Sequence, residues 1–298
     1  VYDIAVPADR LLPLVEQLPV GSAVLIQKPL GRDLAEARAI ARVCRERRLL
    51  AAVNFQLRWS PAMLALRDAI ARGLIGTPTE LEIRVNLYTP WGNWRFLEGI
   101  PRMEVLYHSI HYLDVVRHLV GDPVAVRGVS LHDPKLPRHS DTRTTLLLDI
   151  TRGLRTIVHT NHAHEFGRRY ATSELRLEGT AGAAYALLGV NLDYPRGEPD
   201  RLELAERGGS WHDVPLRGSW FPEAFEGPMA ALQHCVAGDA PEPWTRVADA
   251  VRTMALVEGA YRCFSAPPTP VPESGASLDV DPDPSAPDRA DPEEDEFA

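Results

Sequence analysis

The sequence lacks the Gly-x-Gly-x-x-Gly motif, whose glycines let a helix N-terminus approach the pyrophosphate of a dinucleotide. It also lacks a secretory signal and any apolar run of roughly 20 residues, the length that a membrane-spanning helix requires. We therefore expect a cytoplasmic protein that does not enter membranes. The chain starts at Val1 without Met and directly in a predicted strand, so we expect it to be truncated at its N-terminus.

Cysteine and basic residues are both scarce. The three thiols, Cys44, Cys235 and Cys263, form no Cys-x-x-Cys pair and lie in apolar helical contexts, which predicts buried free thiols in a reducing compartment. The formal charge is −9, much of it in the last few residues. Because nucleic-acid binding needs a basic surface, we expect no nucleic-acid partner. A hydrophobic content of 45% is typical of a soluble globular protein.

Apolar strands alternate with amphipathic helices in residues 1–58. This order predicts a parallel α/β sheet with helices on both faces. The predicted strands are 1–6, 23–26 and 49–53, and the helices are 8–18 and 33–47.

The pattern changes in residues 59–265, which predict an α+β domain with a mostly antiparallel, open sheet and flanking helices. The predicted strands are 79–88, 124–132, 142–150, 154–162 and 173–179, and the helices are 61–72, 104–120, 222–237 and 244–264. Residues 266–298 are rich in Pro, Asp and Ser, so we expect an acidic, disordered tail.

Three loops follow the three N-terminal strands. Functional loops of parallel sheets lie at the carboxyl ends of the strands, so these loops should converge on one edge and form a site. We predict that cofactor-binding residues come from them: Pro7, Gln27, Lys28, Pro29, Asn54 and Arg58.

Lys28 is the clearest catalytic candidate. It follows a buried strand and precedes Pro29, which restricts its backbone. At the carboxyl end of a strand its amine would point into a cleft, and partial burial would lower its pKa and let it bind a substrate hydroxyl. A solvated lysine at a turn is the alternative that position alone leaves open.

A histidine-rich helix carries the second set of candidates, Tyr107, His108 and His111. Tyr107 and His111 are four residues apart and share a helix face, and His111, Asp114 and His118 form a stripe. A neutral imidazole can accept the proton of an alcohol while hydride leaves its carbon. The alternative is that these rings only pack or cap.

No metal site is predicted. His159, His162 and His164 lie close together in the sequence, as do His108 and His111. Zinc usually needs three or four placed ligands, and neither an His-Glu-x-x-His motif nor a Cys/His cluster is present. We instead expect His162 and His164 to share one strand face and line a polyol pocket.

Four aromatic residues surround one strand-to-helix connection. Their flat faces suit sugar rings, but a loop that packs on the core uses the same residues, so both readings stay open. The four are Trp59, Trp91, Trp94 and Phe96.

Five segments in order resemble motifs of the glucose–fructose oxidoreductase and inositol dehydrogenase (Gfo/Idh/MocA) family, and the resemblance runs from Val1 to about Pro270. The family implies a Rossmann domain, of which residues 1–58 would be the second half, and a substrate-binding and oligomerisation domain. It also implies NAD or NADP as cofactor, a sugar, cyclitol or related polyol as substrate, and a homo-oligomer through the C-terminal sheet. The five segments are Asp3–Pro7, Ile26–Pro29, Asn54–Pro61, Gly73–Gly76 and His108–Gly121.

The resemblance also implies roles for single residues. Lys28 matches the lysine of the family's Glu-Lys-Pro tripeptide, which contacts substrate beside the nicotinamide, and His111 matches the proton-accepting histidine of Asp-x-x-x-His. Gln27 replaces the glutamate, and Tyr107 stands at the aspartate. A tyrosine hydroxyl has a pKa near 10, so His108 or His111 would carry more of the proton transfer.

Two other functions stay open beside the dehydrogenase. Some relatives are glycoside hydrolases that use a tightly held NAD, and others could be non-catalytic binding or regulatory proteins of the same fold. Gln27, Tyr107 and the missing glycine motif favour the non-catalytic reading, whereas Lys28 and His111 oppose it.

Overall fold

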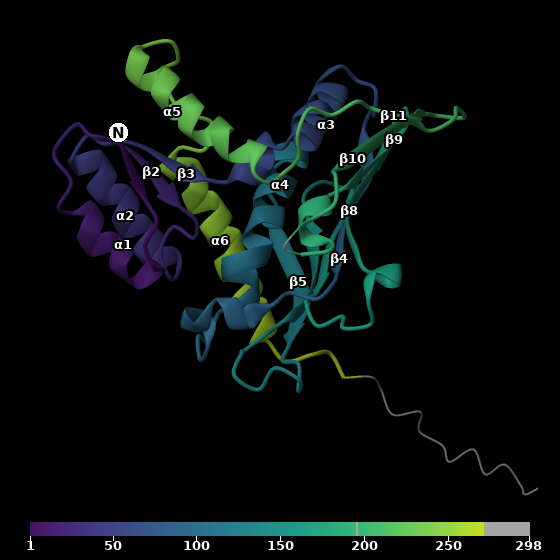
Figure 1. Cartoon of the computed structure of the whole chain (residues 1–298), viewed down its shortest axis with the longest axis horizontal. Coiled ribbons are helices and arrows are strands. Elements are labelled where there is room, and N and C mark those ends of the chain that lie inside the picture. Colours follow the sequence, from purple (N-terminus) through teal and green to yellow (C-terminus); the bar gives the residue numbers. More distant parts are fainter. Residues whose placement is uncertain (195, 271–298) are drawn as a thin grey trace, which may run out of the picture. The chain divides into compact units, whose positions relative to one another are not determined.

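A three-stranded parallel sheet in the order β1–β2–β3 forms the N-terminal part of the protein in this computed structural model, which describes residues 1–194 and 196–270 (Figure 1). The strands alternate with two helices, as the sequence predicts. The elements are β1 (Tyr2–Ile4), α1 (Ala8–Val15), β2 (Ala23–Gln27), α2 (Leu34–Glu46) and β3 (Leu50–Asn54).

Two C-terminal helices return to this small sheet. Helix α5 (Glu226–Ala237) packs against β2 and β3, and helix α6 (Val247–Phe264) packs against α2 and β3. Just before α6, the main-chain oxygen of Thr245 accepts a hydrogen bond from the Val53 amide at 2.7 Å. Residues on the two sides of the predicted boundary therefore pack against each other. The division between residues 58 and 59 stays a prediction.

Both faces of the small sheet are buried. Val24 and Ile26 of β2 belong to the main hydrophobic core, together with Ile40 of α2. The intervening Leu25 faces the opposite way and packs with Leu232 of α5. Continuous apolar runs are what a parallel sheet between two helical layers requires, and they explain why β2 has no polar alternation.

The second sheet has eight strands in the order β11–β10–β9–β8–β4–β7–β6–β5. All neighbours are antiparallel except β4 and β7, which confirms the predicted mostly antiparallel sheet. Its strands are β4 (Pro78–Asn86), β5 (Ala125–Leu131), β6 (Arg143–Asp149), β7 (Arg155–Asn161), β8 (Thr172–Gly179), β9 (Gly182–Leu187), β10 (Arg201–Glu206) and β11 (His212–Asp213).

The sequence did not predict strands β9, β10 and β11. Strand β9 reads Gly-Ala-Ala-Tyr-Ala-Leu, and glycine and alanine are depleted in strands. Its conformation comes from pairing with β8, in which Leu177 lies opposite Ala184. Tertiary pairing overrides a weak local preference here.

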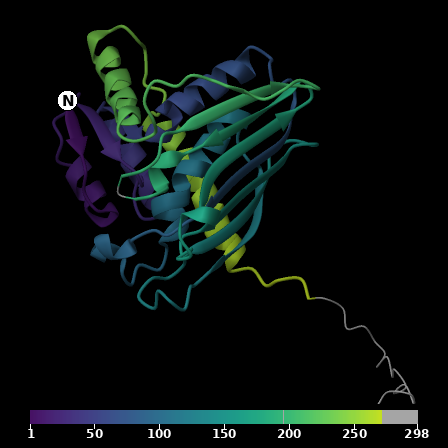
Figure 2. The same cartoon turned by 45° about the vertical axis from the view of Figure 1, so that its right-hand side comes forward.

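Helices cover one face of the eight-stranded sheet (Figure 2). On the central strand β4, Leu81, Ile83 and Val85 are buried, whereas Glu82 and Arg84 point to the other face. This alternation is typical of an antiparallel sheet with one covered face. The expected homo-oligomer contact through the open face stays a prediction. The covering helices include α3 (Pro61–Ala71), α4 (Ile110–Val120) and α6.

Residues Val1–Ala266 form one compact unit. All three thiols are free; Cys44 is buried as predicted, whereas Cys235 and Cys263 are only partly buried. No helix within the described ranges has both the length and the hydrophobicity to cross a bilayer. The predicted disordered tail lies, from residue 271 onward, outside the described residues, and the cytoplasmic location stays a prediction.

Candidate functional site

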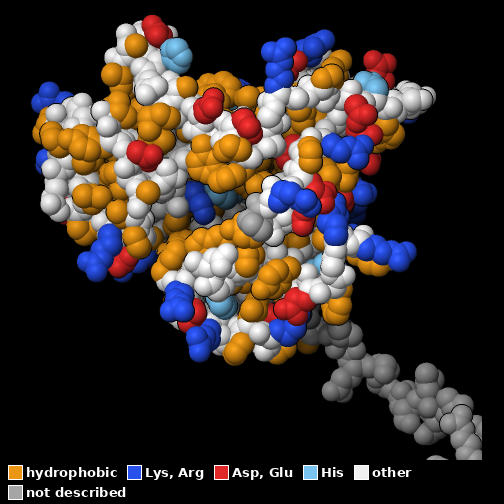
Figure 3. All heavy atoms as spheres, viewed as in Figure 1, with side chains coloured by type: hydrophobic (Ala, Val, Ile, Leu, Met, Phe, Trp, Pro, Cys, Tyr) orange, Lys and Arg blue, Asp and Glu red, His pale blue; other side chains and the backbone are white. Residues whose placement is uncertain are grey.

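A cavity of about 430 Å³ receives side chains from both sheet regions. Figure 3 shows a hollow on this face, with a basic side chain and a histidine ring visible at its floor and hydrophobic side chains around it. All four predicted catalytic residues line the cavity, although they come from segments about 80 residues apart in the chain. These residues are Lys28, Tyr107, His108 and His111.

Lys28 lies where the chain leaves β2, at the carboxyl end of the parallel sheet. Its Nζ donates a hydrogen bond to the main-chain oxygen of Tyr107 at 2.6 Å, so the amine is fixed between the two regions. Burial lowers the pKa of Lys28 to about 8, which makes its ammonium a stronger acid and an easier proton donor than a surface lysine. Lys28 lines the cavity, and its catalytic role stays a prediction.

His108 and His111 come from one continuous helical segment that changes its geometry between them. Residues Val105–Ser109 form a π-helical turn, and α4 begins at Ile110. Such turns insert one extra residue into a helix and often lie at functional sites. The predicted single helix over 104–120 is therefore correct in extent, but its first turn does not have α-helical spacing.

Both rings are held neutral. Burial lowers the pKa of His108 and of His111 well below the ordinary value of 6.5, and the nearby positive charge of Lys28 lowers both further. The edge of the Trp220 ring packs against His111, with ring centroids 5.7 Å apart. A neutral imidazole beside a buried cation has the properties of a proton acceptor near neutral pH.

Tyr107 separates this cavity from a second one of about 800 Å³ and lines both. Pro7 and three arginines lie around the second cavity, at the same carboxyl edge of the small sheet. Burial raises the pKa of the Tyr107 hydroxyl, with smaller contributions from nearby carboxylates. The three arginines are Arg10, Arg32 and Arg102.

The three predicted loops converge, but not all of their residues reach a cavity. Gln27 Nε2 donates to Asp3 Oδ1 at 3.0 Å, and Asn54 Nδ2 donates to Gln27 Oε1 at 2.9 Å. This row of hydrogen bonds joins the carboxyl ends of all three strands. Gln27, Pro29 and Asn54 are not among the described residues that line either cavity, so they support the loop that holds Lys28.

Arg58 does not lie where a cofactor-binding residue was expected. Its guanidinium is buried, donates to both carboxylate oxygens of Asp114 at 2.5 and 2.6 Å, and donates to Asp249 at 2.7 Å. Asp114 is thus part of an ion pair, and the predicted stripe with His111 and His118 does not form one site. A buried guanidinium needs such paired carboxylates, and this explains why Arg58 turns inward.

The aromatic cluster divides into two groups. Trp91, Trp94 and Phe96 line the 430 Å³ cavity. Trp59 instead stacks on Trp244, with ring centroids 4.6 Å apart and an interplanar angle of 21°. Three of the four aromatic side chains therefore line the cavity, and the fourth, Trp59, packs within the fold.

The expected pair of His162 and His164 does not form. His162 is fully buried and contacts Glu104 and Thr89, whereas His164 lines a different cavity. Strand β7 ends at Asn161, so the two-residue periodicity on which the prediction depended does not extend to these positions.

Sequence reasoning missed several residues of the cavity. Gln56, Asn191 and Trp220 line it, and Phe221 and Phe225 close its aromatic wall. Gln56 lies inside a predicted loop, but the others come from segments where no strand or site was predicted. Only the folding of the eight-stranded sheet brings them to Lys28, so no local signal could have found them.

Residues 63–185 match the sequence model of the GFO/IDH/MocA C-terminal domain. This match, the sequence relatives and the structural neighbours all point to the GFO/IDH/MocA oxidoreductase family. The resemblance seen in the five sequence segments and the enzyme class that it implied are confirmed. The chain is 28% identical over 276 residues to a D-apiose dehydrogenase of Paraburkholderia graminis, a match that covers 87% of this chain and 69% of that protein.

Further relatives agree with this family. An inositol 2-dehydrogenase of Rhizobium meliloti is 26% identical over 190 residues, which cover 61% of this chain and 56% of that protein. An Agrobacterium radiobacter oxidoreductase, solved in complex with NAD+, L-tartaric acid and magnesium, has a TM-score of 0.72 at 23% identity. That match covers 88% of this chain and 77% of the other, and it confirms the predicted fold class.

Proposed function

We propose that this chain is an NAD(P)-dependent dehydrogenase that moves hydride to or from a hydroxyl-bearing carbon of a sugar, cyclitol or related polyol. One observation carries the proposal: Lys28 and His111 line the same cavity although they come from different sheet regions. The named relatives, a D-apiose dehydrogenase and an inositol 2-dehydrogenase, support a polyhydroxylated substrate.

The lining of the cavity suits such a substrate. Trp91, Trp94 and Phe96 offer apolar faces for the C–H face of a ring, and Gln56 and Asn191 offer amide groups for its hydroxyls. A volume of about 430 Å³ is in the range of small-molecule sites. Polar groups are few and come from different elements, which is how a pocket fixes the orientation of a ligand.

His111 acts in this proposal as the proton acceptor. In the oxidative direction its neutral ring takes the proton of the substrate hydroxyl while hydride leaves the carbon. The Lys28 ammonium donates a hydrogen bond to the same oxygen and stabilises the negative charge that develops there. In the reductive direction His111 returns this proton to the carbonyl oxygen, while Lys28 keeps its hydrogen bond to the same oxygen. A bound nicotinamide supplies the hydride acceptor or donor.

The second cavity fits the cofactor. It borders the first at Tyr107, contains Pro7, and lies along the carboxyl edge of the parallel sheet, where such sheets bind nucleotides. Arg10, Arg32 and Arg102 place guanidinium groups around it, and guanidinium groups bind phosphate oxygens through paired N–H donors. Lys28 would then lie at the nicotinamide end.

The test is formation of reduced nicotinamide by the full chain with NAD+ or NADP+ and a panel of aldoses, inositols and sugar acids. We expect turnover with at least one substrate and a loss of at least about a hundredfold in kcat/KM in Lys28→Met. Lys135, the other lysine of the sequence, donates to the Ala163 main chain and to Glu165 outside this cavity, so Lys135→Met is the matched control.

Two results would overturn the proposal. One is the absence of reduced nicotinamide across the whole panel in a chain that binds the cofactor. The other is release of nitrophenol from aryl glycosides without net reduction, which would favour the glycoside hydrolase alternative.

A further inference from the structure

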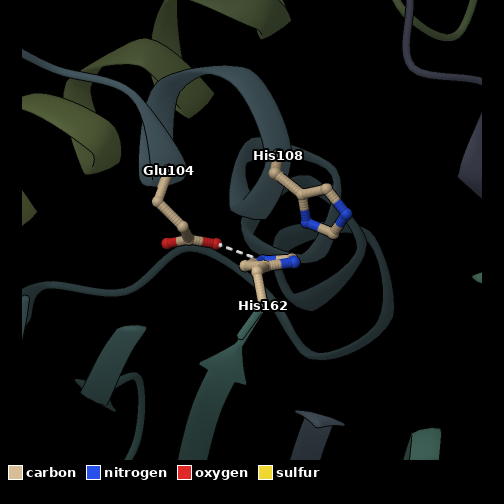
Figure 4. Close-up of side chains that lie close together, drawn as sticks. All are labelled: Glu104, His108 and His162. Carbon is tan, nitrogen blue, oxygen red and sulfur yellow. Dashed lines mark hydrogen bonds and ion pairs between the residues drawn. The ribbon is translucent and has the colours of Figure 1, made fainter. Parts of the chain in front are cut away.

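Three chemically active side chains meet beneath the cavity and have no part in the proposed hydride transfer. Glu104, His108 and His162 bring one potential ligand atom each to within 4.8 Å of the others. Figure 4 shows the Glu104 carboxylate and one ring nitrogen of His108 both turned toward the His162 ring. They come from three positions: the residue before the π-helical turn, the turn itself and the residue directly after β7.

We propose that Glu104, His108 and His162 form a binding site for a divalent transition-metal ion such as zinc. Two imidazoles and one carboxylate are a common ligand set for such ions, in zinc enzymes and in non-haem iron sites. Nothing in the proposed hydride transfer requires this site, so its test is independent of that proposal.

The cluster contains two buried polar atoms without partners. Glu104 Oε2 and His108 Nδ1 make no hydrogen bond to any of the described residues. Leaving such atoms unpaired costs about 1–3 kcal/mol each, so native structures rarely do so without a reason. A metal ion between the two residues would satisfy both atoms at once.

The distances suit an ion. Ligand atoms that are about 2.1 Å from a tetrahedral ion lie about 3.4 Å from one another. His162 Nε2 is 3.1 Å from Glu104 Oε1, so this pair already has close to ligand spacing. His108 packs against His162 with ring centroids 4.1 Å apart, and its ligand atom lies within 4.8 Å of the other two.

The charge state of the cluster also suits a cation. Hydrogen bonds that are donated to a carboxylate favour its charged form. Ser109 Oγ donates to Glu104 Oε1 at 2.5 Å, while the Thr144 hydroxyl is engaged with Ser130 at 2.7 Å. A buried carboxylate therefore keeps a negative charge that a divalent ion would compensate.

A second layer of contacts orients the ligands. The other ring nitrogen of His162, Nδ1, lies 2.8 Å from Thr89 Oγ1, and metal-binding histidines usually have such a partner on the far nitrogen. Thr89 and His108 both line the 430 Å³ cavity. A substrate hydroxyl or a water in the cavity would thus be able to complete the coordination of the ion.

The experiment measures metal binding directly. The tag-free full chain is stripped with a chelator and equilibrated with Zn2+, and the zinc content per chain is determined; Co2+ then reports the ligand field by absorption. We expect one tightly bound ion per chain in the wild type, with ligand-field bands of low-symmetry Co2+. We expect both the bound ion and the Co2+ bands to be lost in His108→Gln and in Glu104→Gln. Glutamine has nearly the same size and shape as the buried glutamate but no charge.

His159→Gln is the matched control, because His159 lies on β7 itself and its ring nitrogen pairs with Thr145 outside the cluster. It should bind zinc as the wild type does, and circular dichroism should show that all variants are folded. No tightly bound ion in the wild type would overturn the proposal, and so would equal retention of zinc by His108→Gln. In either case the Glu104–His162 contact is an ordinary buried hydrogen bond.

Discussion

The two sheets contribute to the site in different ways. The parallel sheet is buried on both faces, so only the carboxyl ends of its strands can present polar side chains, and Lys28 lies at one of them. The eight-stranded sheet has one helix-covered face, and its contribution comes from the segments that lie on that face, above all the π-helical turn and α4. The first sheet offers a cation, and the second region offers two neutral imidazoles.

This difference explains why neither region can form the site alone. Lys28 is held by a hydrogen bond to the main chain of Tyr107, which belongs to the second region. The charge of Lys28 in turn helps to keep His108 and His111 neutral. The charge of the proton donor therefore acts on the proton acceptor across the boundary between the sheets.

The strongest test of this division of roles is His111→Gln. If the second region supplies the proton acceptor, kcat should fall about 10²- to 10⁴-fold, because this is the usual contribution of a general base. Substrate KM should change much less. His234→Gln, on the exposed side of α5, is the control. A kcat within a few-fold of the wild type would show that another group accepts the proton.

The second test concerns the ion pairs that join the two regions. Asp114→Asn removes a carboxylate that binds both donor nitrogens of the buried Arg58. We expect the free energy of unfolding to fall by about 3–5 kcal/mol, because a buried charge loses its partner. Urea denaturation checks this against Asp149→Asn, which breaks an exposed pair with Arg127 and should change stability little.

A similar loss of stability in both variants would contradict the view that the buried pair joins the regions. An unchanged stability in Asp114→Asn would show that Asp249 alone is enough to compensate Arg58.

The third test is the pH dependence of kcat/KM. The Lys28 ammonium loses its proton as pH rises through about 8, so activity should fall above that value by about tenfold per pH unit. The acidic limb should lie well below 6.5, because His111 stays neutral there. Lys28→Arg should move the alkaline limb upward, since guanidinium keeps its proton. An alkaline limb that does not move would assign it to another group.

The smallest expected effect concerns the aromatic wall. Trp94→Ala should raise KM for the sugar about tenfold with little change in kcat, because one aromatic contact contributes up to about 1.5 kcal/mol. Steady-state kinetics with the best substrate of the panel measure both constants. Trp211→Ala, an exposed tryptophan outside the cavity, should leave KM unchanged. Equal effects of the two substitutions would remove the sugar-stacking role.

The sequence predicted the parallel sheet well, because each of its signals is local. A buried run followed by Lys28 and Pro29 needs no knowledge of distant residues. The same holds for Tyr107, His108 and His111, which a helical pattern brings together. Trp220 and Asn191 could not be found, since they reach the cavity only through long-range contacts of strands that local propensity does not mark.

Two errors have the same physical origin. Arg58 was assigned to the cofactor because it follows a strand end, but its partners Asp114 and Asp249 lie 56 and 191 residues away in the sequence. The contact between Glu104 and His162, which the sequence did not predict, joins residues 58 positions apart. Ion pairs and ligand sets depend on which charges the fold brings together, and spacing along one segment does not contain that information.

Helix α6 contacts α2 and β3 on one side and α4 and β5 on the other. Because one helix packs against both regions and shares their hydrophobic core, opening one region exposes apolar surface of the other. The amides of β3 and β5 that are hydrogen-bonded within the sheets should therefore exchange with deuterium at similar slow rates, through one global opening rather than two local ones. A ligand that binds at either sheet would slow amide exchange in both β3 and β5. Deuterium uptake in one strand therefore reports ligand binding at the other sheet as well.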